Sequence, residues 1–179
     1  MKRVLILAVI LSGLLTTLPK AASAQFERAE IGVNGLTCSQ CSRTVEMSLR
    51  KLDFVANIEM NLQHTEGKIT FKKNSKPDMD KIAQAVIDAG FSVRYLKAEL
   101  SNIGQDAEMV SKDCFDLDHN IYVFTETPGD YKGRIIALKF IGKKFLPKNE
   151  FRKMAQYMSQ SCGNSASNGK VYHVQLVKY

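Results

Sequence analysis

The sequence is short of the residues that several common functional classes need. It has no tryptophan and only three histidines in 179 residues, and His64, His119 and His173 stand apart from any second ligand at helical or alternating spacing. No Ser, His and Asp set, no glycine-rich phosphate loop and no close pair of carboxylates stands out. We therefore expect this protein not to be an enzyme.

Long apolar runs are also scarce. The run from Val4 to Leu15 follows two basic residues and precedes the small residues 22–24, an arrangement typical of a secretory signal peptide. We predict that residues 1–24 are such a peptide, cleaved before Gln25. No later run is long enough to span a membrane, and no cysteine follows the cleavage site to carry a lipid. The mature protein is therefore expected to be exported and soluble, without membrane insertion.

Excess charge is modest once this segment is removed. Residues 1–24 contain three basic side chains and no acidic one, so the formal net charge falls from +7 to +4. Grooves that bind nucleic acid usually show a strong basic patch. The small charge, the absent tryptophan and the exported location together argue against a nucleic-acid partner.

The hydrophobic pattern between Ala29 and Leu96 predicts strand, helix, strand, strand, helix, strand. Apolar residues alternate in the strands and recur at about every third or fourth position in the helices. The defining positions are, in order, 29–33, 41–52, 58–62, 69–71, 79–86 and 93–95. This βαββαβ order is typical of the ferredoxin-like fold, with two helices packed on one face of an antiparallel sheet. We therefore expect a first domain over residues 25–97.

The rest of the chain is expected to form a second small α+β domain that is rich in strands. Residues 98–112 are polar and weakly periodic, which indicates a linker or a short surface helix. The C-terminal domain then covers residues 113–179, and its role is unassigned. Its expected elements are strands over 121–125, 134–141 and 172–178 and a helix over 148–161. The whole mature chain is therefore predicted to be of the α+β class.

Chemistry is concentrated at Cys38 and Cys41, which lie between the first strand and the first helix. Two thiols three positions apart at such a junction can converge on one ion. The helix macrodipole and the free amides of the first turn favour thiolate, the form that binds metal. Two sulfurs alone suit Cu(I) or Hg(II) better than Zn(II), which normally takes four ligands. We therefore predict a soft-metal site, with Cu(I) as the first candidate and Hg(II) as the second.

An open site with two ligands also admits a third thiolate, so a metal ion can pass to a partner by ligand exchange. Three alternatives to this reading stay open. The same Cys pair could serve a thiol-disulfide oxidoreductase or a redox sensor. The four cysteines could together hold one zinc ion, or the second domain could be an adhesion or scaffold module beside a metal-sensing first domain.

Cys114 and Cys162 flank the strands and helix of the second domain. In an oxidising compartment unused free thiols are uncommon, so we predict a disulfide between these two residues. Free thiols or a second metal site are the alternatives.

The first domain resembles a heavy-metal-associated domain over residues 30–96. The resemblance rests on the motif Gly-Leu-Thr-Cys-Ser-Gln-Cys at residues 35–41, the hairpin at Gly67, and Ala-Gly-Phe at residues 89–91 before the last strand. Such domains occur in copper chaperones, in copper-transporting ATPases and in the periplasmic mercury-binding protein of bacteria. Residues 98–179 show no resemblance of this kind.

The resemblance implies that Cys38 and Cys41 are the metal ligands. It also implies a periplasmic location and a partner protein in the cell envelope that donates or accepts the metal. Leu36 stands where the family commonly has methionine and is expected to pack beneath the loop. Phe91 stands where bacterial copper chaperones often have tyrosine.

Overall fold

The computed structural model describes residues 24–102, 108–111, 113–126, 135–159, 162 and 169–177 of the chain. Residues 1–23, which belong to the predicted signal peptide, lie outside this part, as do residues 103–107 and 112 of the predicted linker. Among the described helices, none is both long and apolar enough to cross a membrane.

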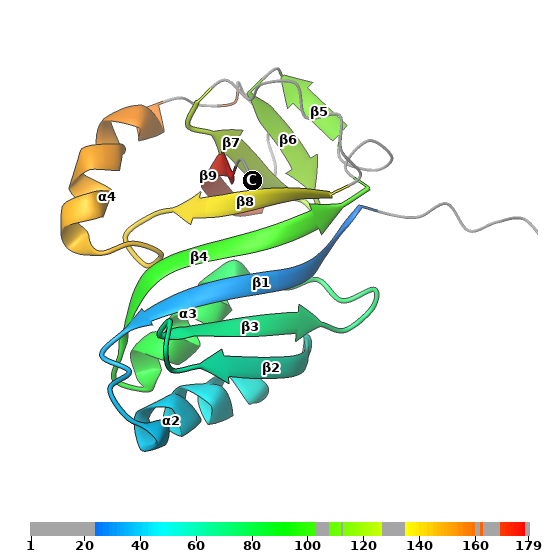
Figure 1. The fold of residues 1–179 in the computed structure, drawn as a ribbon. Coiled ribbons are helices and arrows are strands. Elements are labelled where there is room, and N and C mark those ends of the chain that lie inside the picture. Colours follow the sequence, from blue (N-terminus) through cyan, green and yellow to red (C-terminus); the bar gives the residue numbers. More distant parts are fainter. Residues whose placement is uncertain are drawn as a thin grey trace, which may run out of the picture.

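The first half of the described chain has the predicted order of strands and helices. It runs β1 (Gln25–Asn34), α2 (Ser39–Arg50), β2 (Val55–Asn61), β3 (Glu66–Phe71), α3 (Met79–Asp88) and β4 (Ser92–Ser101). Its four strands pair antiparallel in the order β2-β3-β1-β4. Both helices lie on one face of this sheet (Figure 1). The prediction of a ferredoxin-like βαββαβ fold is confirmed.

The second half adds five strands and one α-helix in the described residues. The elements are β5 (Glu108–Ser111), β6 (Cys114–Leu117), β7 (Asn120–Phe124), β8 (Ile135–Ile141), α4 (Lys148–Met154) and β9 (Val171–Val177). The helix predicted over 148–161 is α-helical only as far as Met154, and Ala155–Ser159 continue it as a 3₁₀ helix. The expected strand-rich α+β character of this half is confirmed.

All nine described strands form one sheet, in the order β2-β3-β1-β4-β8-β9-β7-β6-β5. The strand β4 joins the two halves, because it pairs with β1 on one side and, through residues 97–101, with β8 on the other. Within the predicted linker 98–112, residues 98–101 instead end β4 and residues 108–111 form β5. Only Ala98 and Leu100 are apolar and buried between 97 and 101, too few to reveal a period.

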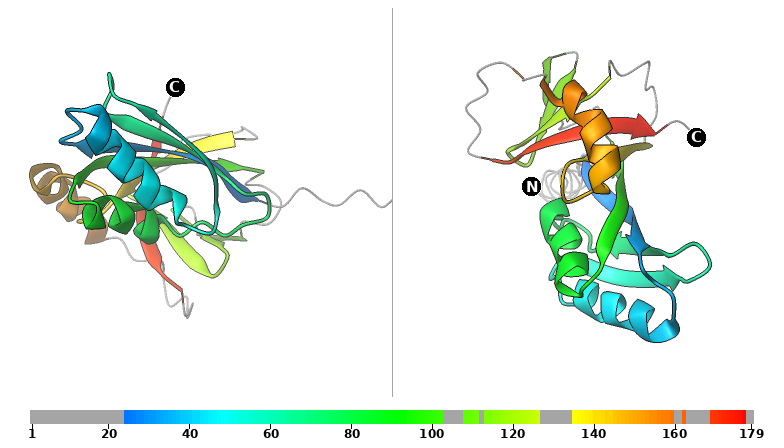
Figure 2. Two further views of the ribbon diagram at one scale, coloured as in Figure 1. Left: turned by 90° about the horizontal axis from the view of Figure 1, so that it is seen from below. Right: turned by 90° about the vertical axis from the view of Figure 1, so that its left-hand side faces the viewer.

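The helices α2 and α3 are amphipathic and bury one face each against the sheet. Val45 and Leu49 of α2 are fully buried and lie four residues apart, the spacing that places side chains on one face of a helix. The hydroxyl of Ser48 donates to the carbonyl of Ala85 at 2.7 Å and ties the two helices together. The left view of Figure 2, seen from below, shows α2 and α3 side by side. The fully buried side chains of α3 are Met79, Ile82, Ala83 and Val86.

A cluster of aromatic side chains joins the cores of the two halves. Phe26 at the start of β1 lies 5.7 Å from the ring of Tyr122 in β7 and 6.3 Å from that of Phe140 in β8. Phe140 in turn meets the ring of Tyr172 in β9 at 5.5 Å. Phe140 is completely buried. The described chain therefore shares one main hydrophobic core across both halves.

Ion pairs close the seam between the halves at the start of α3. The Lys170 ammonium, just before β9, lies 2.8 Å from the carboxylate of Asp78 and 3.0 Å from that of Asp80. A second pair joins Lys76 to Asp118 at 2.6 Å. The seam therefore links the second half directly to a helix of the first.

Asp78 has two functions in this seam. Besides pairing with Lys170, it is the N-cap of α3, because its carboxylate accepts hydrogen bonds from the amides of Asp80 and Lys81. Burial alone would raise the pKa of Asp78, but the Lys170 ammonium and the two amides hold it below its usual value. Partial burial would lower the pKa of Lys170, whereas Asp78 and Asp80 raise it.

Candidate metal centre

The loop between β1 and α2 is shaped by a glycine and anchored by a leucine. Gly35 has φ +90, a left-handed conformation that glycine adopts without steric cost. The amide of Thr37 donates back to the carbonyl of Gly35 at 2.9 Å, which closes a tight turn. Leu36 is only 4% exposed, so it packs beneath the loop as the sequence predicted. The turn therefore delivers the next residue, Cys38, to the surface at the start of α2.

Cys38 is the N-cap residue of α2. Its backbone is extended, with φ −148 and ψ 164, and its sulfur accepts a hydrogen bond from the amide of Cys41 at 3.4 Å. Its carbonyl accepts the first helical hydrogen bond, from Ser42 at 3.1 Å. The sulfur thus occupies the position where serine or aspartate usually caps a helix, among amides without helical partners.

The two thiols lie close together and carry no disulfide. Their Sγ atoms are 2.9 Å apart. Cys38 is exposed and Cys41 is half-buried. Hydrogen bonds from the Cys41 thiol and then from the Cys41 amide lower the pKa of Cys38, with a smaller contribution from the Gln40 amide, because each stabilises the thiolate. The arrangement is a pair of accessible sulfurs of which one is disposed to ionise.

An open groove of about 420 Å³ lies beside the thiols, between α2 and the turn that follows β2. Arg43 and Glu46 form an ion pair on its α2 side at 3.3 Å. Met60 and Leu62 form its apolar side. The alternation predicts a strand over 58–62, but the strand ends at Asn61 and Leu62 is 42% exposed in the turn. Alternation of apolar residues predicts buried positions, so it could not identify the apolar side of this open groove.

The other cysteines do not join this site. In the structure Cys114 and Cys162 form a disulfide with their Cα atoms 6.1 Å apart, beside the buried side chains of Ile121 and Val123. A zinc site built from all four cysteines is therefore not formed. Across the described ranges no group of three or more His, Cys, Asp and Glu residues gathers as metal ligands.

The three histidines lie in different elements. His64 is in the turn between β2 and β3, and His119 is in the turn between β6 and β7, where its φ is +66. His173 lies in β9. It is half-buried, and its Nε2 atom is covered and has no hydrogen-bond partner in the described part of the chain.

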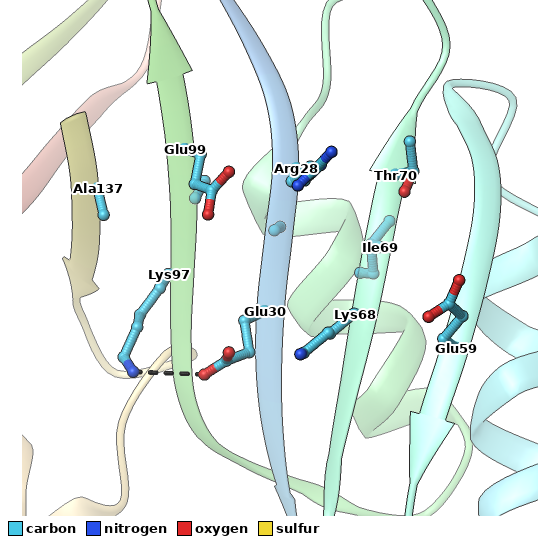
Figure 3. Close-up of a pocket in the computed structure, with 11 residues that line it drawn as sticks. Arg28, Glu30, Glu59, Lys68, Ile69, Thr70, Lys97, Glu99 and Ala137 are labelled. Carbon is cyan, nitrogen blue, oxygen red and sulfur yellow. Dashed lines mark hydrogen bonds and ion pairs between the residues drawn. The ribbon is translucent and has the colours of Figure 1, made fainter. Parts of the chain in front are cut away.

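A second depression, of about 500 Å³, lies on the face of the sheet opposite the helices. Charges of alternating sign cross it from strand to strand, as Figure 3 shows, and Glu30 pairs with Lys97 at 3.3 Å. Burial alone would raise the pKa of Glu30, but hydrogen bonds from Tyr95 and Lys97 and the nearby cations lower it. No sulfur or imidazole lines this depression. Its side chains do not suit a soft ion, so the thiol pair remains the candidate metal centre.

Comparison with known proteins places the thiol loop in a family. Residues 30–92 match the heavy-metal-associated domain. The mercuric transport protein periplasmic component of Pseudomonas fluorescens is 31% identical over 68 residues, which are 38% of this chain and 74% of that protein. The chain belongs to the heavy-metal-associated domain family. The match confirms the resemblance seen in the sequence and leaves the residues beyond it unassigned.

Other relatives of this heavy-metal-associated domain are parts of larger proteins. Copper-transporting ATPase 1 of Rhizobium meliloti (strain 1021) is 41% identical over 69 residues, or 38% of this chain. The match spans 8% of that ATPase and 9% of a copper-transporting ATPase of Helicobacter pylori. Among solved structures, oxidised MerP from Ralstonia metallidurans CH34 is 29% identical over 40% of this chain and 97% of that chain, with a TM-score of 0.33.

Proposed function

We propose that this chain is an exported protein that binds Cu(I) through Cys38 and Cys41 and passes it to a partner protein in the cell envelope. The observation that carries the proposal is the pair of free sulfurs 2.9 Å apart at the start of α2, one of them exposed. The family is one of heavy-metal binding. Two thiolates suit a soft monovalent ion of low coordination number.

Metal capture requires a small movement of the thiol loop. A metal-sulfur bond of about 2.3 Å, the value for zinc, would place two sulfurs on opposite sides of an ion about 4.6 Å apart. The Sγ atoms at 2.9 Å must therefore separate. Cys38 can supply this movement because its side chain is exposed, whereas Cys41 packs against the core. Cys41 is then the fixed ligand and Cys38 the ligand that moves.

Transfer by ligand exchange follows from the same difference between the two sulfurs. A thiolate of the partner adds to Cu(I) and forms a third copper-sulfur bond. The bond to Cys38 then breaks, and the released thiolate takes a proton from water. A second partner thiolate replaces Cys41 in the same way. The ion stays Cu(I) throughout, so no electron acceptor is needed.

Anaerobic titration of the mature protein with Cu(I), with Cys38 and Cys41 as thiols and the Cys114–Cys162 disulfide kept intact, tests the proposal in competition with a chromogenic Cu(I) chelator. We expect one tightly bound equivalent in the parent and none in the double variant Cys38→Ser, Cys41→Ser. The matched control is Cys114→Ser, Cys162→Ser, which removes the same number of sulfur atoms and should keep the equivalent. Equal binding by the first double variant and the parent would refute the proposal. A parallel titration with Hg(II) determines which ion is preferred.

A thiol-disulfide oxidoreductase or redox sensor is the second candidate. The short sulfur-sulfur distance and the lowered pKa of Cys38 also favour attack on a disulfide. Metal-free protein should then reduce a model disulfide with turnover, and its reduction potential should lie in the range of known oxidoreductases. If the protein reduces the model disulfide no faster than a free dithiol does, this candidate is removed.

A further inference from the structure

The strand β4 carries an irregularity directly beside the thiol loop. Gly32 of β1 pairs with Tyr95, but the next residue, Val33, pairs with Val93, so Arg94 is an extra residue in β4. Such a β-bulge turns a side chain away from the ordinary alternation, and bulges are common next to functional sites. Because of it, Val93 is buried while Arg94 and Tyr95 are both only half-buried.

The guanidinium of Arg94 is held in place by Gly32 and the ring of Tyr95. It lies over Gly32, where a Cβ atom would come within 2.9 Å of its Nε atom and would also collide with the ring of Tyr95. Its Cζ atom is 5.2 Å from the centre of that ring, in cation-π contact. The hydroxyl of Tyr95 is in turn bonded to Glu30 at 2.7 Å and to Glu66 at 2.9 Å. Neighbouring strands therefore fix the ring on which Arg94 rests.

From this position over Gly32, the Arg94 side chain reaches the turn between β2 and β3. Its Nη2 atom donates to the carbonyl of His64 at 2.7 Å. The next residue, Thr65, has φ +51 and accepts a hydrogen bond from the amide of Val33 at 2.9 Å. Val33 is completely buried and lies two residues before Gly35, which opens the thiol loop. The guanidinium is thus linked through one turn to the backbone that carries Cys38.

The Nε atom of Arg94 is buried and left without a hydrogen bond to any of the described residues in this arrangement. Burying a donor without a partner costs free energy, so a side chain without other constraints would expose this atom to water. The position of the Arg94 side chain is therefore explained by its hydrogen bond to the turn and not by solvation of its own Nε atom.

We propose that Arg94 is a positioning residue of the metal centre: it clamps the turn at residues 62–65 against the end of β1 and so fixes the base of the thiol loop. This inference rests on the function proposed above. The contact between Arg94 and the turn is to a backbone carbonyl, and no described hydrogen bond joins Arg94 to either sulfur. Without this clamp the amide of Val33 opens more often, and the two sulfurs meet the ion in a less defined geometry.

The test compares two methionine variants of the full mature chain. Arg94→Met keeps most of the aliphatic stem and removes the guanidinium. Arg50→Met is the control. Arg50 also donates to a backbone carbonyl, that of Ile58 at 3.4 Å, and it pairs with Glu46 at 2.8 Å, but it lies at the far end of α2. Amide hydrogen exchange at Val33 reports on the clamp, and Cu(I) competition reports on the site.

Arg94→Met should speed exchange at Val33 about tenfold and weaken Cu(I) binding about threefold. Arg50→Met should leave both close to the parent values. Arg94→Lys keeps a charged donor and should recover part of each loss, which simple destabilisation would not produce. The proposal is overturned if Arg94→Met matches Arg50→Met in either measurement. If the parent itself binds no Cu(I), the proposed function fails, and exchange at Val33 still decides whether Arg94 holds the turn.

Discussion

Replacement of Asp78 gives the most informative test of the seam between the two halves. Asp78→Ala removes both the cap of α3 and the partner of Lys170. Loss of an N-cap costs about 1 kcal/mol. Loss of a partly exposed ion pair costs about 0.5 kcal/mol, since the two side chains are 25% and 45% exposed. The free energy of unfolding should therefore fall by about 1.5 kcal/mol.

A second substitution at the same position separates the two contributions. Asn caps helices about as well as Asp, so Asp78→Asn should lose only the ion pair, about 0.5 kcal/mol. The assay is urea unfolding of the mature protein at pH 7, followed by circular dichroism. In a domain of this size Asp78→Ala should also lower the melting temperature by about 3 to 6 °C. Asp53→Ala is the control, because Asp53 is exposed and makes no side-chain hydrogen bond or ion pair in the described structure.

Acid should reduce the difference between the parent and Asp78→Asn. The pKa of Asp78 is lower in the folded state than in the unfolded chain. Its ionic contribution is therefore complete above the unfolded value of about 3.9 and is lost as the pH falls through the folded value. A difference that stays constant from pH 6 to pH 2 would refute the assigned ion pair. Equal losses in Asp78→Asn and Asp78→Ala would refute the cap.

Two further predictions concern the second half of the chain. The variant Cys114→Ser, Cys162→Ser removes the disulfide between residues 48 positions apart. Its free energy of unfolding, measured by urea denaturation without reductant, should fall by about 2 to 4 kcal/mol. An unchanged denaturation midpoint would contradict this. Phe140→Ala empties a completely buried site among the rings of Phe26 and Tyr172 and should cost about 3 to 5 kcal/mol. If the two halves share one core, unfolding of this variant should remain a single transition when monitored at probes in either half.

The first half could be predicted because its signals are local. Alternation marked β1, β2 and β3, and the spacing of Val45 and Leu49 marked the buried face of α2. The cysteine pair was found from spacing and from its position before a helix. Its distance, the exposure of Cys38 and the hydrogen bond from the Cys41 amide needed coordinates. These three facts depend on backbone angles that a residue list does not contain.

The second half could be predicted only in outline because its structure depends on distant partners. The strands β5 and β6 have four residues each, too few to show alternation. The parallel pairing of β7 with β9 joins segments about fifty residues apart, and no local pattern records it. The bulge at Arg94 left one trace, since Val93 and Leu96 are three residues apart instead of two.

The double pairing of β4 sets a practical limit on dividing this protein. A recombinant fragment that stops at residue 97 would discard the stretch at which β4 meets β8. It would also uncover Phe26, whose neighbours Tyr122 and Phe140 come from the discarded part. Unpaired strand edges beside bare aromatic surface recruit other chains, so such a fragment should precipitate on concentration. Biochemistry on the thiol loop should therefore be carried out with the nine-stranded sheet intact.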